Sequence, residues 1–161
     1  MTGEWLAALE AAPVVAALRG SMWVYPLVNA AHILGVALLV GGIVPLDLRL
    51  LGMWRPIPPG YLWQVLTRTA ATGLVLAVLT GALLFSTRAT EYAVSGLFLS
   101  KLLIISLGVI NVVIVHRAAA RQAWRMNSTT GPLPWRFRAA AGVSLAAWVS
   151  SLALGRLIGY F

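Results

Sequence analysis

The stretch MWVYPLVNAAHILGVALLVGGIVPL, residues 22–46, decides the fold because it is long, apolar and free of formal charge. An α-helix needs roughly 20 mostly apolar residues to cross about 30 Å of hydrocarbon. Three further segments, residues 70–87, 97–116 and 139–161, reach or nearly reach that length. The sequence therefore predicts an all-α fold, a four-helix transmembrane bundle with these segments as its spans.

Composition supports the same class of protein. Sixty per cent of the residues are hydrophobic, 10% are charged and the mean hydropathy is +0.89, whereas about 25% of a soluble domain is charged. Four spans use most of the 161 residues, so we expect residues 1–161 to form a single integral membrane domain with the lipid bilayer as its partner. The absence of cysteine excludes iron–sulfur clusters and haem attached through thioethers.

The segment before the first span has a different pattern. Glu4, Glu10 and Arg19 alternate with apolar residues, and Pro13 interrupts the run. This pattern predicts a short amphipathic N-terminal helix lying at the membrane interface.

The arginines predict the orientation of the spans. The loop regions between spans one and two and between spans three and four carry Arg49, Arg55, Arg68, Arg117, Arg121, Arg125, Arg136 and Arg138. Under the positive-inside rule these regions are cytoplasmic. We therefore expect a multi-pass protein of the bacterial inner (cytoplasmic) membrane with both termini extracytoplasmic. The net charge of +8 is then explained by topology and lipid head groups, and no nucleic acid partner is expected.

Small residues recur at helical spacing in two of the spans. This spacing predicts packing seams, because helices in lipid associate through close backbone approach. The second span has Gly73, Ala77 and Gly81, and the fourth has Ser144, Trp148, Ser151, Gly155 and Gly159.

His32 is the strongest candidate for a functional residue because it lies deep in the first span. Asn29 and Gly35 lie one turn before and after it, so an amide that orients the ring and a gap for a planar ligand would share its face. A neutral imidazole can bind a haem iron or another metal, relay a proton or serve a quinone, or hydrogen-bond a neighbouring helix. The sequence leaves these three roles open.

His116 lies at the arginine-rich end of the third span, next to Arg117. Asp47 marks the arginine-rich end of the first span. At 1.5 Å per residue, His32 lies about 22 Å from Asp47 along the helix. One haem shared by both histidines therefore requires a strongly tilted first helix or a buried Asp47.

Lys101 and Arg156 lie near the opposite, outer ends of their spans. Their cations would either bind haem propionates or a lipid phosphate close to His32, or extend to the membrane surface.

Asp47 is the only acidic residue next to or inside an apolar segment. We expect a structural ion pair with Arg49 or Arg68 that fixes the first hairpin, because an unpaired charge at that level is costly. A proton-carrier role is the alternative.

Four strings carry a family resemblance: YPLVNAAHILGVALLVGG (25–42), DLRLLG (47–52), FLSKLL (98–103) and GRLIGY (155–160). They resemble an uncharacterised bacterial family of small four-span integral membrane proteins. More distantly, the H-x-x-G step at His32 and the later glycine pair resemble the membrane domains of copper-resistance D-type proteins and b-type cytochromes. That second resemblance implies haem b ligation by His32, and by His116 if the histidines act together.

Two functional classes follow from these residues. One is a haem b- or metal-binding electron-transfer subunit centred on His32, with Lys101 and Arg156 as anion anchors and His116 as a further ligand. The other is a non-catalytic scaffold or anchor subunit, working as a homo-oligomer or within a larger membrane complex. We do not expect an enzyme on its own, since the sequence has no nucleophile elbow, H-E-x-x-H motif, P-loop or paired carboxylates.

Overall fold

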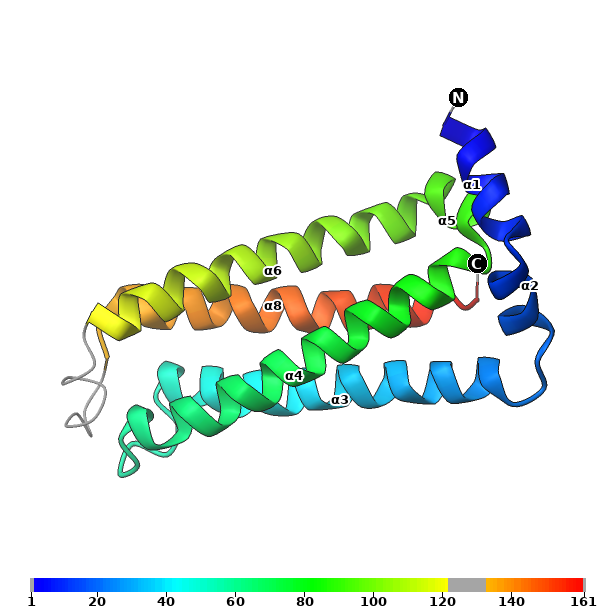
Figure 1. Ribbon diagram of the computed structural model, residues 1–161. Coiled ribbons are helices and arrows are strands. Elements are labelled where there is room, and N and C mark those ends of the chain that lie inside the picture. Colours follow the sequence, from blue (N-terminus) through cyan, green and yellow to red (C-terminus); the bar gives the residue numbers. More distant parts are fainter. Residues whose placement is uncertain (1, 122–132, 161) are drawn as a thin grey trace.

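The structure, a computed structural model, describes residues 2–121 and 133–160, and this part of the chain is helical with no strand. Figure 1 shows the long helices running along the bundle and the short ones gathered at one end. The all-α bundle predicted from the sequence is confirmed. In chain order the helices are α1 (Thr2–Ala11), α2 (Pro13–Gly20), α3 (Val24–Leu51), α4 (Pro59–Ser86), α5 (Ala89–Val94), α6 (Gly96–Arg121) and α8 (Trp135–Leu157).

The four long helices, α3, α4, α6 and α8, are each long and apolar enough to cross a membrane. Large apolar side chains such as Leu79, Leu103 and Ile114 are exposed on their outer faces. Exposed apolar surface of this extent is expected where lipid is the solvent. The chain is therefore a multi-pass membrane protein.

The boundaries of all four long helices differ from the predicted spans, and those of α3 and α4 matter most for the site. α3 continues through Pro45 and Asp47 to Leu51, where Gly52 ends it in a left-handed conformation with φ 116°. α4 begins at Pro59 rather than at Ala70, because hydropathy marks where a helix leaves lipid and not where its hydrogen bonds end. Asp47 is consequently one turn inside a helix, not at its end.

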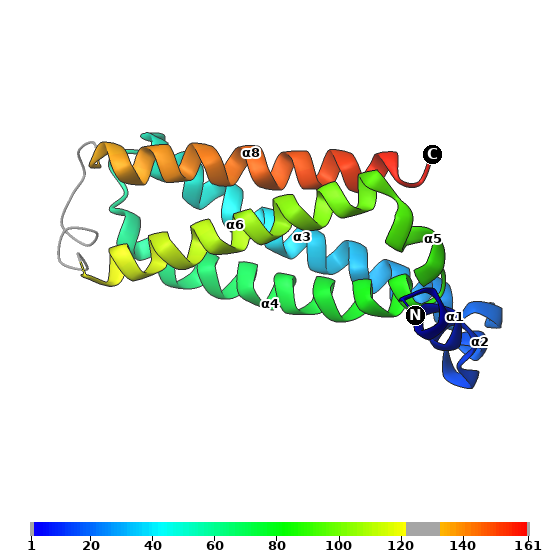
Figure 2. The same ribbon diagram turned by 90° about the horizontal axis from the view of Figure 1, so that it is seen from above.

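The long helices pack as two pairs. α3 packs along α4, α6 packs along α8, and α3 joins the pairs by packing against α8, whereas the backbones of α4 and α6 scarcely approach each other. Figures 1 and 2 show the arrangement from two directions. α3 is therefore the central helix. One buried cluster, at the end away from α1 and α2, contains Leu46, Leu50, Ala119, Leu133, Phe137 and Ala141, and a second contains Leu39, Ile43, Ala70 and Trp148.

Glycines let α3 and α4 touch backbone to backbone. A Cβ placed at Gly35 would lie 2.6 Å from the Ala77 amide nitrogen, and one at Gly73 would lie 2.6 Å from the Gly35 carbonyl oxygen. A Cβ placed at Gly42 would lie 2.6 Å from the Leu66 carbonyl oxygen. The seam predicted at Gly73 and Ala77 is confirmed, since both are buried against α3.

Adding a methyl group to this seam should separate the two helices. Gly73→Ala should lower the free energy of unfolding in detergent by about 1–3 kcal/mol, the usual cost of overpacking. Gly41→Ala is the matched control, because Gly41 lies in α3 with nothing within 4 Å of a Cβ. Equal stability of the two variants in a denaturing-detergent titration would contradict the packing described here.

The N-terminal segment forms two short helices instead of the single amphipathic helix predicted. Ala12 is extended (φ −57°, ψ 134°) and separates α1 from α2, because a proline disfavours helical geometry in the residue before it. The amphipathic pattern itself is present, since Leu6, Val15 and Leu18 are buried.

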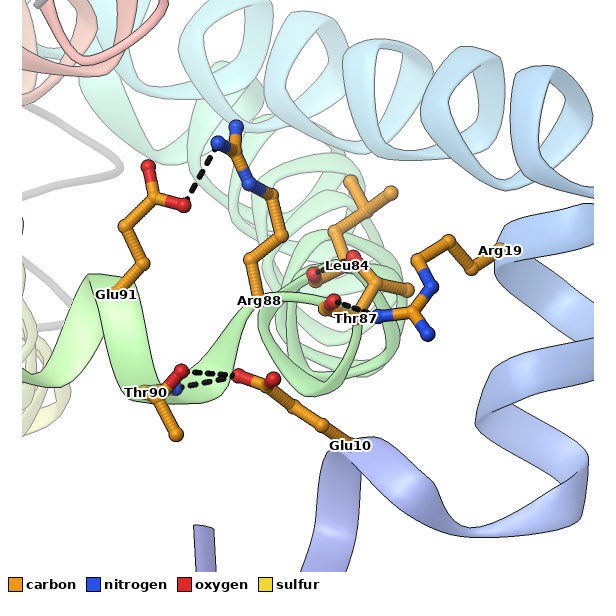
Figure 3. Close-up of polar contacts among 7 residues, drawn as sticks. All are labelled: Glu10, Arg19, Leu84, Thr87, Arg88, Thr90 and Glu91. Carbon is orange, nitrogen blue, oxygen red and sulfur yellow. Dashed lines mark hydrogen bonds and ion pairs between the residues drawn. The ribbon is translucent and has the colours of Figure 1, made fainter. Parts of the chain in front are cut away.

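Polar contacts fasten α1 and α2 to the α4–α5 junction. Thr90 donates hydrogen bonds to a Glu10 carboxylate oxygen from its backbone nitrogen (2.6 Å) and from its hydroxyl (2.7 Å). Arg19 donates to the Thr87 carbonyl oxygen at 3.5 Å, and Arg88 pairs with Glu91 at 2.7 Å within α5 and its cap (Figure 3).

The contact at Glu10 should depend on pH. The backbone and hydroxyl hydrogen bonds from Thr90 lower the pKa of Glu10 from 4.5. A lowered pKa means that the contact stabilises the fold fully above 4.5 and is lost as the pH falls through the folded-state value. A spin label on Ala8→Cys should therefore become more mobile well below pH 4.5, and that transition should vanish in Glu10→Gln. Unchanged mobility in acid would show that this contact does not hold α1.

Candidate functional site

Polar groups inside the bundle gather at two levels, one around His32 and one around Asp47. Their separation can be estimated along α4, which contacts both groups. His32 contacts Ala77 of α4, and His116, which lies near Asp47, contacts Trp63 of α4. Ala77 and Trp63 are fourteen residues apart in one helix, which corresponds to about 21 Å at 1.5 Å per residue. We call the two groups the His32 cluster and the Asp47 cluster.

The imidazole of His32 is held by α4. Its Nδ1 lies 2.9 Å from the Ala77 carbonyl oxygen and 3.1 Å from the Thr80 hydroxyl. A carbonyl oxygen only accepts, so Nδ1 carries the hydrogen in the neutral ring and Nε2 has the free lone pair. The Thr80 hydroxyl donates to the Leu76 carbonyl oxygen at 2.6 Å, which leaves its oxygen as a second acceptor for His32.

Lys101 joins the His32 cluster from α6. Its ammonium lies against Gly155 of α8, where a Cβ would be 3.0 Å from Nζ, and its charge acts on the His32 ring. The Arg156 side chain does not point toward His32. It is exposed and donates a hydrogen bond to the Tyr160 hydroxyl at 2.6 Å, and its guanidinium carbon lies 4.7 Å from the centre of the Tyr160 ring. The charge of Lys101 therefore acts on His32 from α6, whereas Arg156 lies at the surface.

Two neighbours of His32 have different roles from those expected. Asn29 is exposed, and the ring is oriented by α4 instead. The space beside Gly35 is filled by the backbone of α4, so it does not accommodate a planar ligand. Gly81 lies against the imidazole, since a Cβ there would be 3.0 Å from Cε1.

His116 is not part of the His32 cluster. It is exposed, and its ring centre lies 5.9 Å from that of Trp63. The separation along α4 means that the two histidines do not face one common haem in this bundle.

Asp47 does not form the predicted ion pair. Arg49, only 1% exposed, donates instead to the carbonyl oxygens of Ile57 (2.5 Å) and Arg55 (3.3 Å). Arg68 is exposed, and no ion pair of Asp47 is found within residues 2–121 and 133–160. Residues two positions apart in a helix point in nearly opposite directions, which separates Asp47 from Arg49.

The Asp47 carboxyl lies inside the bundle beside a cavity of about 40 Å³. The residue is 6% exposed, and its Oδ2 has no hydrogen-bond partner within residues 2–121 and 133–160. Ser144 of α8 provides the one favourable polar contact that acts on it. Polar and aromatic residues that line the cavity with Asp47 and Ser144 are Trp63, Thr67, Asn111 and His116.

Sequence reasoning did not assign Asn111, Ser144 and Thr67 to a site. Asn111 donates to the Ala140 carbonyl oxygen at 2.9 Å and so joins α6 to α8. Its signal was available, because it is the one amide in an otherwise apolar stretch of the third span. Ser144 was recognised only as a member of a packing seam.

Comparison with known proteins was made for the whole chain. It matches no protein family, curated protein or solved structure. Among the described residues no group of three or more histidine, aspartate or glutamate side chains is arranged to hold a metal ion. Function is therefore argued from the two clusters.

Proposed function

We propose that this protein is a haem b-binding electron-transfer subunit in which Nε2 of His32 ligates the iron. The observation that carries the proposal is the bond from His32 Nδ1 to the Ala77 carbonyl oxygen. Histidines that ligate metals almost always donate their other ring N–H to a carbonyl or carboxylate, which fixes the tautomer and the ring direction. A bound haem would supply one-electron redox chemistry.

The donor set favours haem over a bare metal ion. A protein site for copper or zinc needs three or four side-chain ligands, whereas a porphyrin brings four nitrogen donors and needs only an axial one. His32 is half-buried, and Lys101 lies beside it as a counter-charge for a propionate. The side of the bundle between α4 and α6 lacks close backbone contact, so side-chain movement there would suffice to admit a flat ligand. The resemblance to b-type cytochrome membrane domains supports the same assignment.

The alternative is a non-catalytic scaffold or anchor subunit within a homo-oligomer or a larger membrane complex. One observation favours it: the His32 hydrogen bond already joins α3 to α4 beside the close contact at Gly35. If the role of His32 is to join these two helices, it needs no cofactor.

A spectrum separates the two functions. Protein purified from cells supplied with haem should show a Soret band that shifts on reduction with dithionite. His32→Gly should lose the band and regain it when free imidazole is added, which a purely structural defect would not allow. Lys101→Ala should reduce haem occupancy.

Two variants serve as controls. His116→Ala and Asn29→Ala should keep the wild-type spectrum, because neither side chain belongs to the His32 cluster. Wild-type protein that stays colourless after reconstitution with haem would overturn the ligand assignment and leave the scaffold function.

We also propose that the protein lies in the bacterial inner membrane with the α1–α2 end extracytoplasmic. The distribution of charge supports this orientation. Arg55, Arg68, Arg117, Arg121, Arg136 and Arg138 lie toward the end of the bundle away from α1 and α2, while Arg125 is outside the described residues. All three glutamates belong to α1 and α5 at the other end.

Reporter fusions test this orientation. Alkaline phosphatase fused after Phe161 should be active, because it folds only outside the cytoplasm, and a fluorescent protein exported to the same place should stay dark. The reverse pattern would invert the topology.

A further inference from the structure

We infer that the Asp47 cluster is a proton-binding site, in which the Asp47 carboxyl and one water molecule in the adjoining cavity take up a proton through His116. This inference is independent of haem binding, because the Asp47 cluster lies at a different level of the bundle from His32.

The carboxyl lacks what a buried carboxylate needs. Asp47 is 6% exposed, and its Oδ2 has no hydrogen-bond partner in the part of the chain that the structure describes. An ionised side chain inside a membrane protein is costly unless it is paired or solvated. A neutral carboxylic acid removes the charge and carries its own O–H donor, so the protonated form suits this environment better.

The groups that face Asp47 do not compensate a negative charge. α4 presents Trp63 and Thr67, and the Thr67 hydroxyl donates to the Trp63 carbonyl oxygen. α6 presents Asn111, whose amide donates to α8. Only the Ser144 hydroxyl acts on the carboxyl.

Arg49, the charged residue nearest to Asp47 in α3, is directed away from it. On α3 itself, the Arg49 guanidinium donates to loop carbonyl oxygens. Of the side chains lining the cavity, His116 is the one titratable group besides Asp47.

The cavity has the size and polarity to hold water. Its volume of about 40 Å³ exceeds the roughly 10–15 Å³ that one water molecule requires. Asp47, Ser144 and Asn111 provide polar atoms around it, and a buried water typically makes about three hydrogen bonds. Such a water would donate a hydrogen bond to Oδ2 of the carboxylate, or accept one from Oδ2 when the carboxyl is protonated.

His116 connects the cavity to the exterior. It is exposed, lines the cavity and lies in the last turns of α6, which ends at Arg121. An imidazole ring can both accept and donate a proton and can therefore relay protons. In the proposed step the imidazolium gives its proton to the water, which passes a proton to the Asp47 carboxylate. The products are a neutral imidazole and a neutral carboxylic acid.

The oxygen atoms of this cluster make a monovalent cation such as Na⁺ the competing occupant. Carboxylate, hydroxyl and amide oxygens are ligands of hard cations. A bound cation would require Asp47 to be ionised, whereas a bound proton makes it neutral. The protonation state of the carboxyl therefore distinguishes a proton site from a cation site.

Infrared difference spectroscopy of the full chain in lipid nanodiscs measures that state directly. The sequence has only four acidic side chains, and the other three are glutamates of α1 and α5. At neutral pH the wild type should show a protonated-carboxyl C=O band that shifts in heavy water and disappears in the near-isosteric Asp47→Asn. Glu10→Gln is the matched control and should keep the band.

Kinetics test the route. After a pH jump, His116→Phe should reach the same final band intensity as wild type but on the order of tenfold more slowly, because a positioned proton relay is lost. Circular dichroism should first show that each variant is folded. Absence of the band from the wild type at neutral pH, its loss on adding NaCl at constant pH, or an unchanged rate in His116→Phe would each overturn the inference.

Discussion

The backbone contact between α3 and α4 is the constraint on which the rest of the bundle depends. Gly35, Gly42 and Gly73 let the two helices approach until atoms of one backbone fill the space where side chains of the other would lie. Lipid provides no hydrophobic force between helices, so close packing of this kind has to hold them together. The contact also fixes the rotation of α3, which brings His32 to the Ala77 carbonyl oxygen. α8 then packs on a neighbouring face of α3.

Two polar side chains of the central helix α3 differ in how far their hydrogen-bonding capacity is satisfied. His32 has two acceptors on α4 within 3.1 Å, whereas Oδ2 of Asp47 has no partner and lies beside a cavity. Trp148 Nε1 is the other buried side-chain atom without a partner in the described residues. Unsatisfied polar atoms are rare in membrane interiors because no bulk water compensates them. The two clusters therefore differ in kind: in one the imidazole is held by hydrogen bonds, and in the other, one carboxyl oxygen, Oδ2, has no partner among the described residues.

Hydropathy and residue spacing predicted the parts of this fold that depend on local sequence. The spans, the seam at Gly73 and Ala77, and the placement of Lys101 on the side of His32 follow from composition and helical period. The expected pair between Asp47 and an arginine failed because α3 continues past Pro45, which turns Asp47 inward and Arg49 toward the loop. Helix rotation is set by packing against α4 and α8, and no local pattern encodes it.

Paired cysteine cross-linking measures that rotation most directly, since the chain has no cysteine of its own. With a short thiol-specific cross-linker, His32→Cys combined with Gly81→Cys should link efficiently, because the His32 ring lies against Gly81. His116→Cys combined with Trp63→Cys should also link, given the ring contact between those residues. The exchanged pair, His116→Cys with Gly81→Cys, should remain unlinked within one molecule. Efficient intramolecular linking of that exchanged pair, or none between positions 32 and 81, would contradict the two-level arrangement.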